Sequence, residues 1–296
     1  LLSNTGTVSS VSTSLESLGV DVDETSTVTS LTVGHTTPVS IKAGRSLSGA
    51  VTVTGGSIKL GETGTLASAV TMSGGILEAD NNLTLSGPLT QSGNIAIAVA
   101  QNKTLSYSGA AVNLGAKTLT MSGKGTFNNT NALVLNDASS KLLLSNTTTV
   151  GSVSTSLASL GVDVNEDSTI TSLAVGHTTP VSIAAGKTLS GGITVTDGSI
   201  KLGETGTLAS TVSMSGGTLD ADESLTLSGN LTQSGNITID VAENKTLGYS
   251  GAAINLGAKT LTMSGKGTFN NTNALVLNDA NSKLLLSNTT TVGRVS

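Results

Sequence analysis

One segment of this chain occurs twice in a row, and this repeat constrains the fold more than any other feature. Residues 1–142 recur as residues 143–284, with 116 identical pairs among the 142 compared, and residues 285–296 begin a third copy. Long tandem repeats indicate an architecture in which neighbouring units stack. We therefore divide the chain into a first repeat (1–142), a second repeat (143–284) and the start of a third (285–296). We expect these residues to be cut from a longer array.

Each long repeat contains a shorter and looser period, in which an apolar segment precedes a turn of small residues. One such coil cannot bury its apolar side alone, so stacking must supply the core. The pattern predicts an all-β fold, a parallel β-solenoid (β-helix) with about seven coils per 142-residue repeat and about 16 to 26 residues per coil. The expected coil breaks lie near Ser26, Ser46, Thr65, Leu83, Thr104, Thr126 and Leu142.

Differences between the two copies indicate which side chains face inward. Ala96 and Ala98 of the first copy become Thr238 and Asp240 in the second, whereas the apolar residues between and beside them are unchanged. This period of two is the period of a β-strand. We expect Ala96 and Ala98 to be exposed. The residues expected in the core are Ile95, Ile97, Val99, Leu83, Leu85, Leu119 and Met121.

One stretch departs from the strand periodicity. Val11, Leu15 and Leu18 are spaced as on one face of a helix, and Gly19 follows where a helix C-cap would stand. The segment predicts either a short helical turn or an irregular part of the longest coil.

Composition excludes several functional classes. The chain has no Cys, no Trp, 1% aromatic residues and a formal net charge of −5. Without Cys there are no disulfides, thiolate metal sites or cysteine nucleophiles. With so few aromatics there is little to stack on bases or sugars, and the negative charge gives no footprint for nucleic acid. No apolar run approaches the roughly 18 residues of a membrane-spanning helix. We expect no nucleic-acid partner and no membrane insertion of this segment.

The acidic turns are the candidates for a metal site. Asp163, Asn165 and Asp167 alternate as at the start of a calcium-binding loop, and Asp21 and Asp23 occupy the matching turn of the first copy. The glycine at the sixth position and the bidentate Glu of such a loop are missing. The sequence therefore favours a solvated acidic turn, and calcium is the one cofactor for which these residues are candidates.

The sequence shows no distinctive catalytic constellation. Its two histidines, His35 and His177, lie in Gly-His-Thr-Thr-Pro turns one long repeat apart, which favours a local role in the turn over a shared metal. Serine is too abundant for a Ser/His/Asp triad to be recognised. Polysaccharide-cleaving enzymes do use β-helices, but Glu16, Asp23 and Lys42 are changed in the second copy. We predict no catalytic residues and no enzymatic activity.

Two motifs connect the chain to a known group of bacterial surface proteins. The clearest examples are Lys117-Thr-Leu-Thr-Met-Ser-Gly123 and Ala132-Leu-Val-Leu-Asn-Asp-Ala138, and similar segments occur along the whole chain. This residue pattern resembles the passenger regions of autotransporters and the haemagglutinin-type repeats of giant bacterial surface adhesins. The resemblance implies a secreted or surface-bound bacterial solenoid, and it transfers no binding residue.

The sequence therefore predicts an extracellular or cell-surface structural protein, a β-solenoid that forms part of a long fibre, stalk or filament. The alternative is an adhesin module that binds glycans or host surfaces through its outward Ser/Thr/Asn-rich face. The expected partners are further copies of the chain, end to end and also laterally through the Ser/Thr face. One long repeat should advance the axis by about 34 Å, because seven coils are spaced by about 4.8 Å each.

Overall fold

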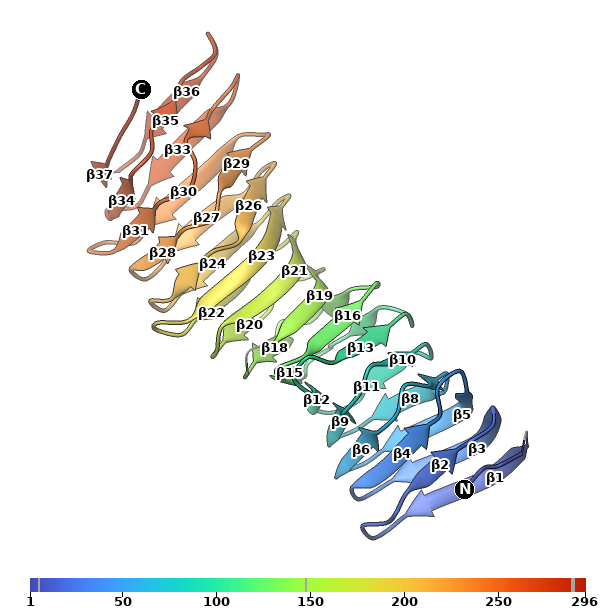
Figure 1. Ribbon diagram of the computed structural model, residues 1–296. Coiled ribbons are helices and arrows are strands. Elements are labelled where there is room, and N and C mark those ends of the chain that lie inside the picture. Colours follow the sequence, from blue (N-terminus) through green and yellow to red (C-terminus); the bar gives the residue numbers. More distant parts are fainter. Residues whose placement is uncertain (5, 147, 289–290) are drawn as a thin grey trace. The chain divides into compact units, whose positions relative to one another are not determined.

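The computed structural model describes residues 1–4, 6–146, 148–288 and 291–296. It is an all-β structure in which parallel strands stack as the coils of a β-solenoid (Figure 1). The described residues form no helix. The chain consists of two compact units, one made of Leu1–Val134 and Ser140–Ser152, the other of Leu135–Ser139 and Val153–Ser296. The predicted fold class is confirmed.

Each coil contributes one strand to a parallel sheet, here named sheet A. Successive strands pair in register, so that backbone hydrogen bonds run from coil to coil. Seven described strands of the first unit belong to this sheet, which agrees with seven coils per repeat. They are β2 (Val20–Val22), β4 (Thr37–Ile41), β6 (Ser57–Leu60), β9 (Ile76–Ala79), β12 (Ile95–Val99), β15 (Thr118–Gly123) and β18 (Lys141–Leu144).

The opposite side of each coil forms a second parallel sheet, named sheet B. In the fourth to seventh coils a short corner divides its strand into two, and Gly87 lies at this corner because a Cβ there would be 1.9 Å from the carbonyl oxygen of Ser68. The strands are β1 (Thr7–Thr13), β3 (Ser26–Val33), β5 (Ser46–Val53), β7 (Thr65–Leu66), β8 (Ala69–Met72), β10 (Leu83–Leu85), β11 (Leu89–Gln91), β13 (Thr104–Tyr107), β14 (Val112–Asn113), β16 (Thr126–Asn129), β17 (Leu133–Leu135) and β19 (Thr149–Thr155).

The second unit repeats this arrangement. Its sheet A contains β20 (Gly161–Val164), β22 (Thr179–Ile183), β24 (Ser199–Gly203), β27 (Thr218–Ala221), β30 (Ile237–Val241), β33 (Thr260–Ser264) and β36 (Lys283–Leu286). Its sheet B contains β21 (Ser168–Val175), β23 (Thr188–Val195), β25 (Thr207–Leu208), β26 (Thr211–Met214), β28 (Leu225–Leu227), β29 (Leu231–Gln233), β31 (Thr246–Tyr249), β34 (Thr268–Asn271) and β37 (Thr291–Val292). The short strands β32 (Ile254–Asn255) and β35 (Leu275–Val276) pair with each other, as β14 and β17 do in the first unit.

Six of the seven predicted coil breaks coincide with the first residue of a sheet B strand. These residues are Ser26, Ser46, Thr65, Leu83, Thr104 and Thr126. The seventh prediction is wrong, because Leu142 lies inside β18 of sheet A and the next sheet B strand begins at Thr149. Both sheets use the same apolar alternation, so the sequence pattern alone does not separate them.

The core lies between the two sheets and consists of inward-facing columns. Leu47, Leu66 and Leu85 are in register on three successive coils and are fully buried. All seven residues expected in the core are buried, namely Ile95, Ile97, Val99, Leu83, Leu85, Leu119 and Met121. The predicted strand register is therefore confirmed.

The outward positions beside this core differ from the prediction in one respect. Ala96 and Ala98 are half-buried rather than exposed, and Asp240, which replaces Ala98 in the second repeat, is also half-buried. The reason is that strands on neighbouring coils cover part of each outward side chain. Asp240 nevertheless lies on the outer side of its strand, as the alternation requires.

The segment that follows β1 is an irregular loop, and the helical turn considered above is wrong. Leu15 and Leu18 are 74% and 99% exposed, so their helical spacing does not reflect packing against a core. Gly19 has a φ of 90°, and a Cβ there would lie 1.9 Å from the carbonyl oxygen of Pro38. The glycine is needed for a close approach to the next coil rather than for a helix C-cap.

Candidate functional site

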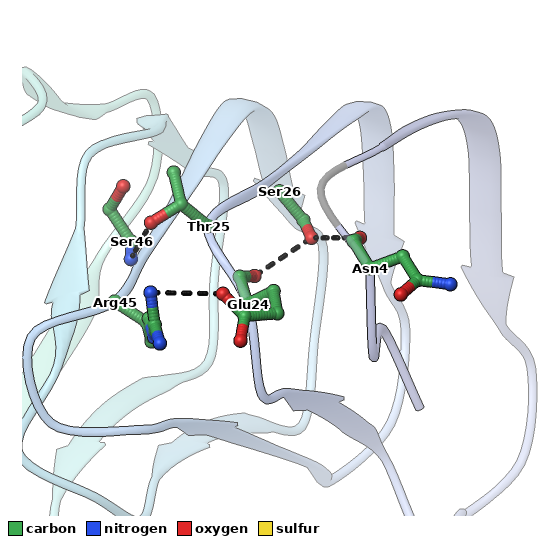
Figure 2. A network of polar contacts seen from close by, with 6 residues as sticks. All are labelled: Asn4, Glu24, Thr25, Ser26, Arg45 and Ser46. Atoms are coloured by element: carbon green, nitrogen blue, oxygen red, sulfur yellow. Dashed lines mark hydrogen bonds and ion pairs between the residues drawn. The ribbon is translucent and has the colours of Figure 1, made fainter.

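The turns that precede the sheet B strands carry polar contacts between coils (Figure 2). Arg45 Nη1 lies 2.9 Å from Glu24 Oε2. Thr25 Oγ1 accepts a 3.3 Å hydrogen bond from the backbone N–H of Ser46, and Ser26 Oγ donates to the carbonyl oxygen of Glu24 at 2.8 Å. The first two contacts tie the turn to that of the next coil, whereas the bond from Ser26 to Glu24 closes the turn itself. Ser26 Oγ also donates to the carbonyl oxygen of Asn4 on the preceding coil at 3.4 Å.

The matching turn of the second repeat uses its acidic residues in the same way. Glu166 Oε2 accepts a 2.5 Å hydrogen bond from Lys187 Nζ, and this contact raises the pKa of Lys187. Asp167 Oδ1 accepts a 2.8 Å hydrogen bond from the backbone N–H of Thr188. Both carboxylates are therefore engaged with the following coil.

The residues predicted as calcium ligands do not form one cluster. Asp21 lies in β2 and Asp163 in β20, while Asp23, Asn165 and Asp167 lie in the turns that follow those strands. Within the described ranges, no group of three or more His, Asp or Glu side chains is placed to hold a metal ion. Calcium binding at these turns stays a prediction.

A column of charged residues lies on the outer face of sheet A in the second unit. Asp220 and Asp240 are in register on neighbouring coils. Lys201 Nζ lies 3.2 Å from Asp220 Oδ2 and 3.9 Å from Asp222 Oδ2, and Ser264 Oγ donates to Asp240. Burial raises the pKa of Asp220, with a smaller contribution from the neighbouring carboxylates, and these effects outweigh the attraction of Lys201.

We expect Asp220→Asn to raise the thermal unfolding midpoint at neutral pH but not near pH 3. The raised pKa means that folding favours the protonated carboxyl. Its contribution is therefore present below the unfolded-state pKa of about 3.9 and is lost as the pH rises through the folded-state pKa. Asparagine stays neutral, so the difference between variant and wild-type midpoints should grow from pH 3 to pH 7. Glu78→Gln, at the matching position of the first repeat, is the control. If Asp220→Asn were less stable than the wild type at pH 7, the raised pKa assigned to Asp220 would be contradicted.

The two histidines occupy equivalent turns between sheet B and sheet A, one in each unit. Both side chains are exposed. The carbonyl oxygen of His35 accepts a 2.9 Å hydrogen bond from Thr37 Oγ1, and that of His177 accepts one of the same length from Thr179 Oγ1. These bonds close the turn locally, as the sequence motif suggested.

One asparagine in each repeat is buried at the end of a sheet B strand. Asn129 is 4% exposed, and its Nδ2 donates to the carbonyl oxygens of Asn131 and Ser152 at 2.9 and 2.6 Å. Its Oδ1 accepts from the backbone N–H groups of Gly151 and Ser152 at 3.0 and 3.2 Å. Asn271 makes the equivalent contacts in the second repeat. The side chain thus supplies the hydrogen bonds that the backbone lacks where the sheet B strand ends.

A shallow hollow lies over sheet A in the first unit. Its volume is about 500 Å³, and it is lined by Gly75, Ile76, Asn94, Ile95, Ala96, Thr118 and Thr120. Thr218 and Thr238 replace Ile76 and Ala96 in the second repeat. The lining contains no ionisable group, so it offers no acid–base chemistry.

The outer face of sheet B, here named the hydroxyl face, is defined by the absence of charge. No described strand of sheet B contains Asp, Glu, Lys, Arg or His. In the first unit its central column is in register over five coils and consists of Ser12, Thr32, Thr52, Thr71 and Thr90. In the second unit the column consists of Ala174, Thr194, Ser213 and Thr232. All these side chains are exposed or half-buried.

Comparison of the chain with protein-family models, with curated proteins and with solved structures finds no match. In the part of the chain that the structure describes, no helix is long and apolar enough to cross a membrane. The geometry defines the class of protein as a tandem-repeat parallel β-solenoid.

Proposed function

We propose that this protein is a structural segment of an extended extracellular β-solenoid, part of a long fibre, stalk or filament whose copies stack end to end. The observation that carries the proposal is the register of the stacked coils, which is the same in both repeats. The resemblance to bacterial surface solenoids supports a place outside the cell.

Leucines of the coil that contains β36 belong to the same core columns as buried leucines of the first repeat. Leu286 is 55% exposed and Leu277 is 41% exposed, whereas Leu144 and Leu135, one repeat earlier in the sequence, are 0% exposed. Leu286 is in register with the buried Met263 of the preceding coil, so its side chain faces inward. A further coil stacked on β36 would bury these leucines, as the coils of the first repeat bury Leu135 and Leu144.

Coil stacking follows the same register in both repeats, which supports continued addition. Phe127 of β16 is in register with Val150 of β19. One repeat later, Phe269 of β34 is in register with Val292 of β37. Each added coil extends the two sheets and adds one layer of core, so stability is collective rather than due to one residue.

We expect Leu286→Glu to abolish end-to-end association, because a carboxylate at this edge would have to be buried by the next coil. Leu285→Glu is the matched control, since Leu285 is the neighbouring residue of β36 and is in register with the outward-facing Thr262. Light scattering over a range of concentrations measures the association of the wild type and of both variants. Equal association of the wild type and Leu286→Glu would contradict the proposal.

The second candidate function is an adhesive module that binds glycans or another surface. The exposed hydroxyl columns of sheet B favour it, because hydroxyl groups can both donate and accept hydrogen bonds to sugars. Retention on an insoluble neutral polysaccharide tests it directly.

A further inference from the structure

We propose that the hydroxyl face of sheet B is a lateral interface, and that its partner is the same face of a second copy of this chain. This contact goes beyond the end-to-end stacking proposed above, because it uses a different surface and does not depend on the edge at β36. Four observations support it, namely charge, side-chain chemistry, area and the burial of the aromatic residues.

Charge distribution favours this face over sheet A. The chain has a formal net charge of −5, so two copies repel each other unless their charged groups stay apart. In the second unit the strands of sheet A carry Lys201 and Lys283 as well as Asp163, Asp220 and Asp240, whereas the described strands of sheet B carry no charge. Charged residues are depleted from the centre of protein interfaces and remain at the rim. The Glu24–Arg45 and Glu166–Lys187 pairs lie in the turns that border sheet B, where such a rim would be.

The side chains of the face can pair with identical side chains. A hydroxyl group donates one hydrogen bond and accepts others, so a threonine column is complementary to a second threonine column in a two-fold contact. In the first unit the Oγ1 atoms of Thr52, Thr71 and Thr90 make no hydrogen bond within the described chain, so they are available to a partner. In the second unit Thr232 Oγ1 donates to Ser213 Oγ at 3.2 Å, and each hydroxyl keeps acceptor capacity for a partner. The coil spacing of about 4.8 Å is the same on both faces, so the columns match along their whole length.

The available area is close to what a stable dimer needs. Seven coils at about 4.8 Å span about 34 Å, and a strand of about six residues spans about 20 Å. One repeat therefore offers about 700 Å², against about 800 Å² per partner in a protein–protein interface of standard size. The face of one unit therefore supplies most, but not all, of the standard area per partner.

A second copy fits this face better than a sugar does. Carbohydrate sites usually place an aromatic ring against the sugar, and the four aromatic residues of the chain are Tyr107, Phe127, Tyr249 and Phe269. All four are at most 1% exposed and stack on each other inside the core, with ring centroids 5.9 Å apart in each pair. The central columns of the face consist mainly of hydroxyl and methyl groups, with Asn113 and Asn128 exposed on neighbouring strands, and these groups can pack against the same groups of a second copy.

Sedimentation equilibrium of the full chain tests the proposal. Leu286→Glu is included in every protein so that end-to-end contacts do not contribute. We expect a monomer–dimer equilibrium, and we expect Thr71→Glu combined with Ser213→Glu to raise the dissociation constant at least tenfold. Thr71→Lys combined with Ser213→Lys should do the same, because either charge would be buried in the contact. Ala98→Asp is the control on sheet A, where the second repeat already carries Asp240, and it should leave the dissociation constant unchanged.

Three results would overturn the proposal. The first is a chain that stays monomeric up to the highest concentration reached. The second is a control variant that weakens the dimer as much as the sheet B variants do. The third is a monomeric chain retained on insoluble cellulose and released by the Glu pair, which would show that the face binds a neutral polysaccharide instead. Thermal unfolding midpoints confirm that each variant is folded, and Thr90→Glu with Thr232→Glu replaces any pair that is not. End-to-end association of the wild type is measured separately, so the two proposals fail independently.

Discussion

Ile97→Asp is expected to unfold the first unit. Ile97 is fully buried and stands in register between Leu77 and Met121 of the neighbouring coils. An unpaired carboxylate in this column should cost more than about 4 kcal/mol, among the largest effects seen for single substitutions. The milder Ile97→Ala should cost about 2–5 kcal/mol through the cavity that it leaves. Urea denaturation followed by circular dichroism measures both.

Ala98→Asp provides the control for this prediction. It places the same carboxylate one residue further along β12, on the outer side, where the second repeat carries Asp240. We expect a change within about 0.5 kcal/mol, as for other surface substitutions. Similar losses for Ile97→Asp and Ala98→Asp would show that the strand does not have the register described here.

Asn129→Leu is expected to cost about 3 kcal/mol or more. The substitution removes two donated and two accepted hydrogen bonds and leaves the backbone groups of Asn131, Gly151 and Ser152 without these partners. A buried polar group without a partner costs about 1–3 kcal/mol. Asn129→Asp keeps nearly the same shape but loses both donors and turns a carboxylate oxygen toward two carbonyl oxygens, so it should also destabilise. Urea denaturation of both variants gives the values.

Asn128 is the matched position for this test. It is the preceding residue of β16, it has the same chemistry, and its side chain is exposed. Asn128→Leu and Asn128→Asp should change the free energy of unfolding by no more than about 0.5 kcal/mol. If the Asn128 and Asn129 variants lost the same stability, the buried asparagine would not have the structural role assigned to it.

The fold could be predicted from the sequence because the sequence contains two independent periods, a long repeat of 142 residues and an alternation of two residues. The long repeat indicates stacked units, and the alternation around Ile95 and Ile97 gives the inward side of the strand. In a solenoid each residue packs mainly against residues of the neighbouring coil, so local patterns carry most of the information about burial. That is why the whole predicted core set was correct.

The errors arise where local pattern and contact disagree. Leu15 and Leu18 have the spacing of a helix, but no core lies beside them and both are exposed. Leu142 has the alternation of a strand, but alternation does not say which of the two sheets the strand joins. The role of Asn129 depends on Ser152, 23 positions away, and nothing in the local sequence indicates that contact.

The candidate surfaces were less accessible to sequence reasoning than the core. A single strand without charge is common in a chain with 11% charged residues. The absence of charge becomes informative only when the strands are assigned to sheets, because every described strand that contains a charged residue then belongs to sheet A. The calcium candidates Asp163 and Asp167 remain a prediction from spacing, with Asp163 in β20 and Asp167 in the turn that follows it.

Electron cryomicroscopy of the native material tests the central claim most directly. If the protein is a segment of a continuous parallel β-solenoid, the images should show filaments with a spacing of about 4.8 Å between coils and an axial repeat of about 34 Å for each 142-residue unit. Monodisperse 29.1 kDa particles that do not associate at any concentration would contradict the account.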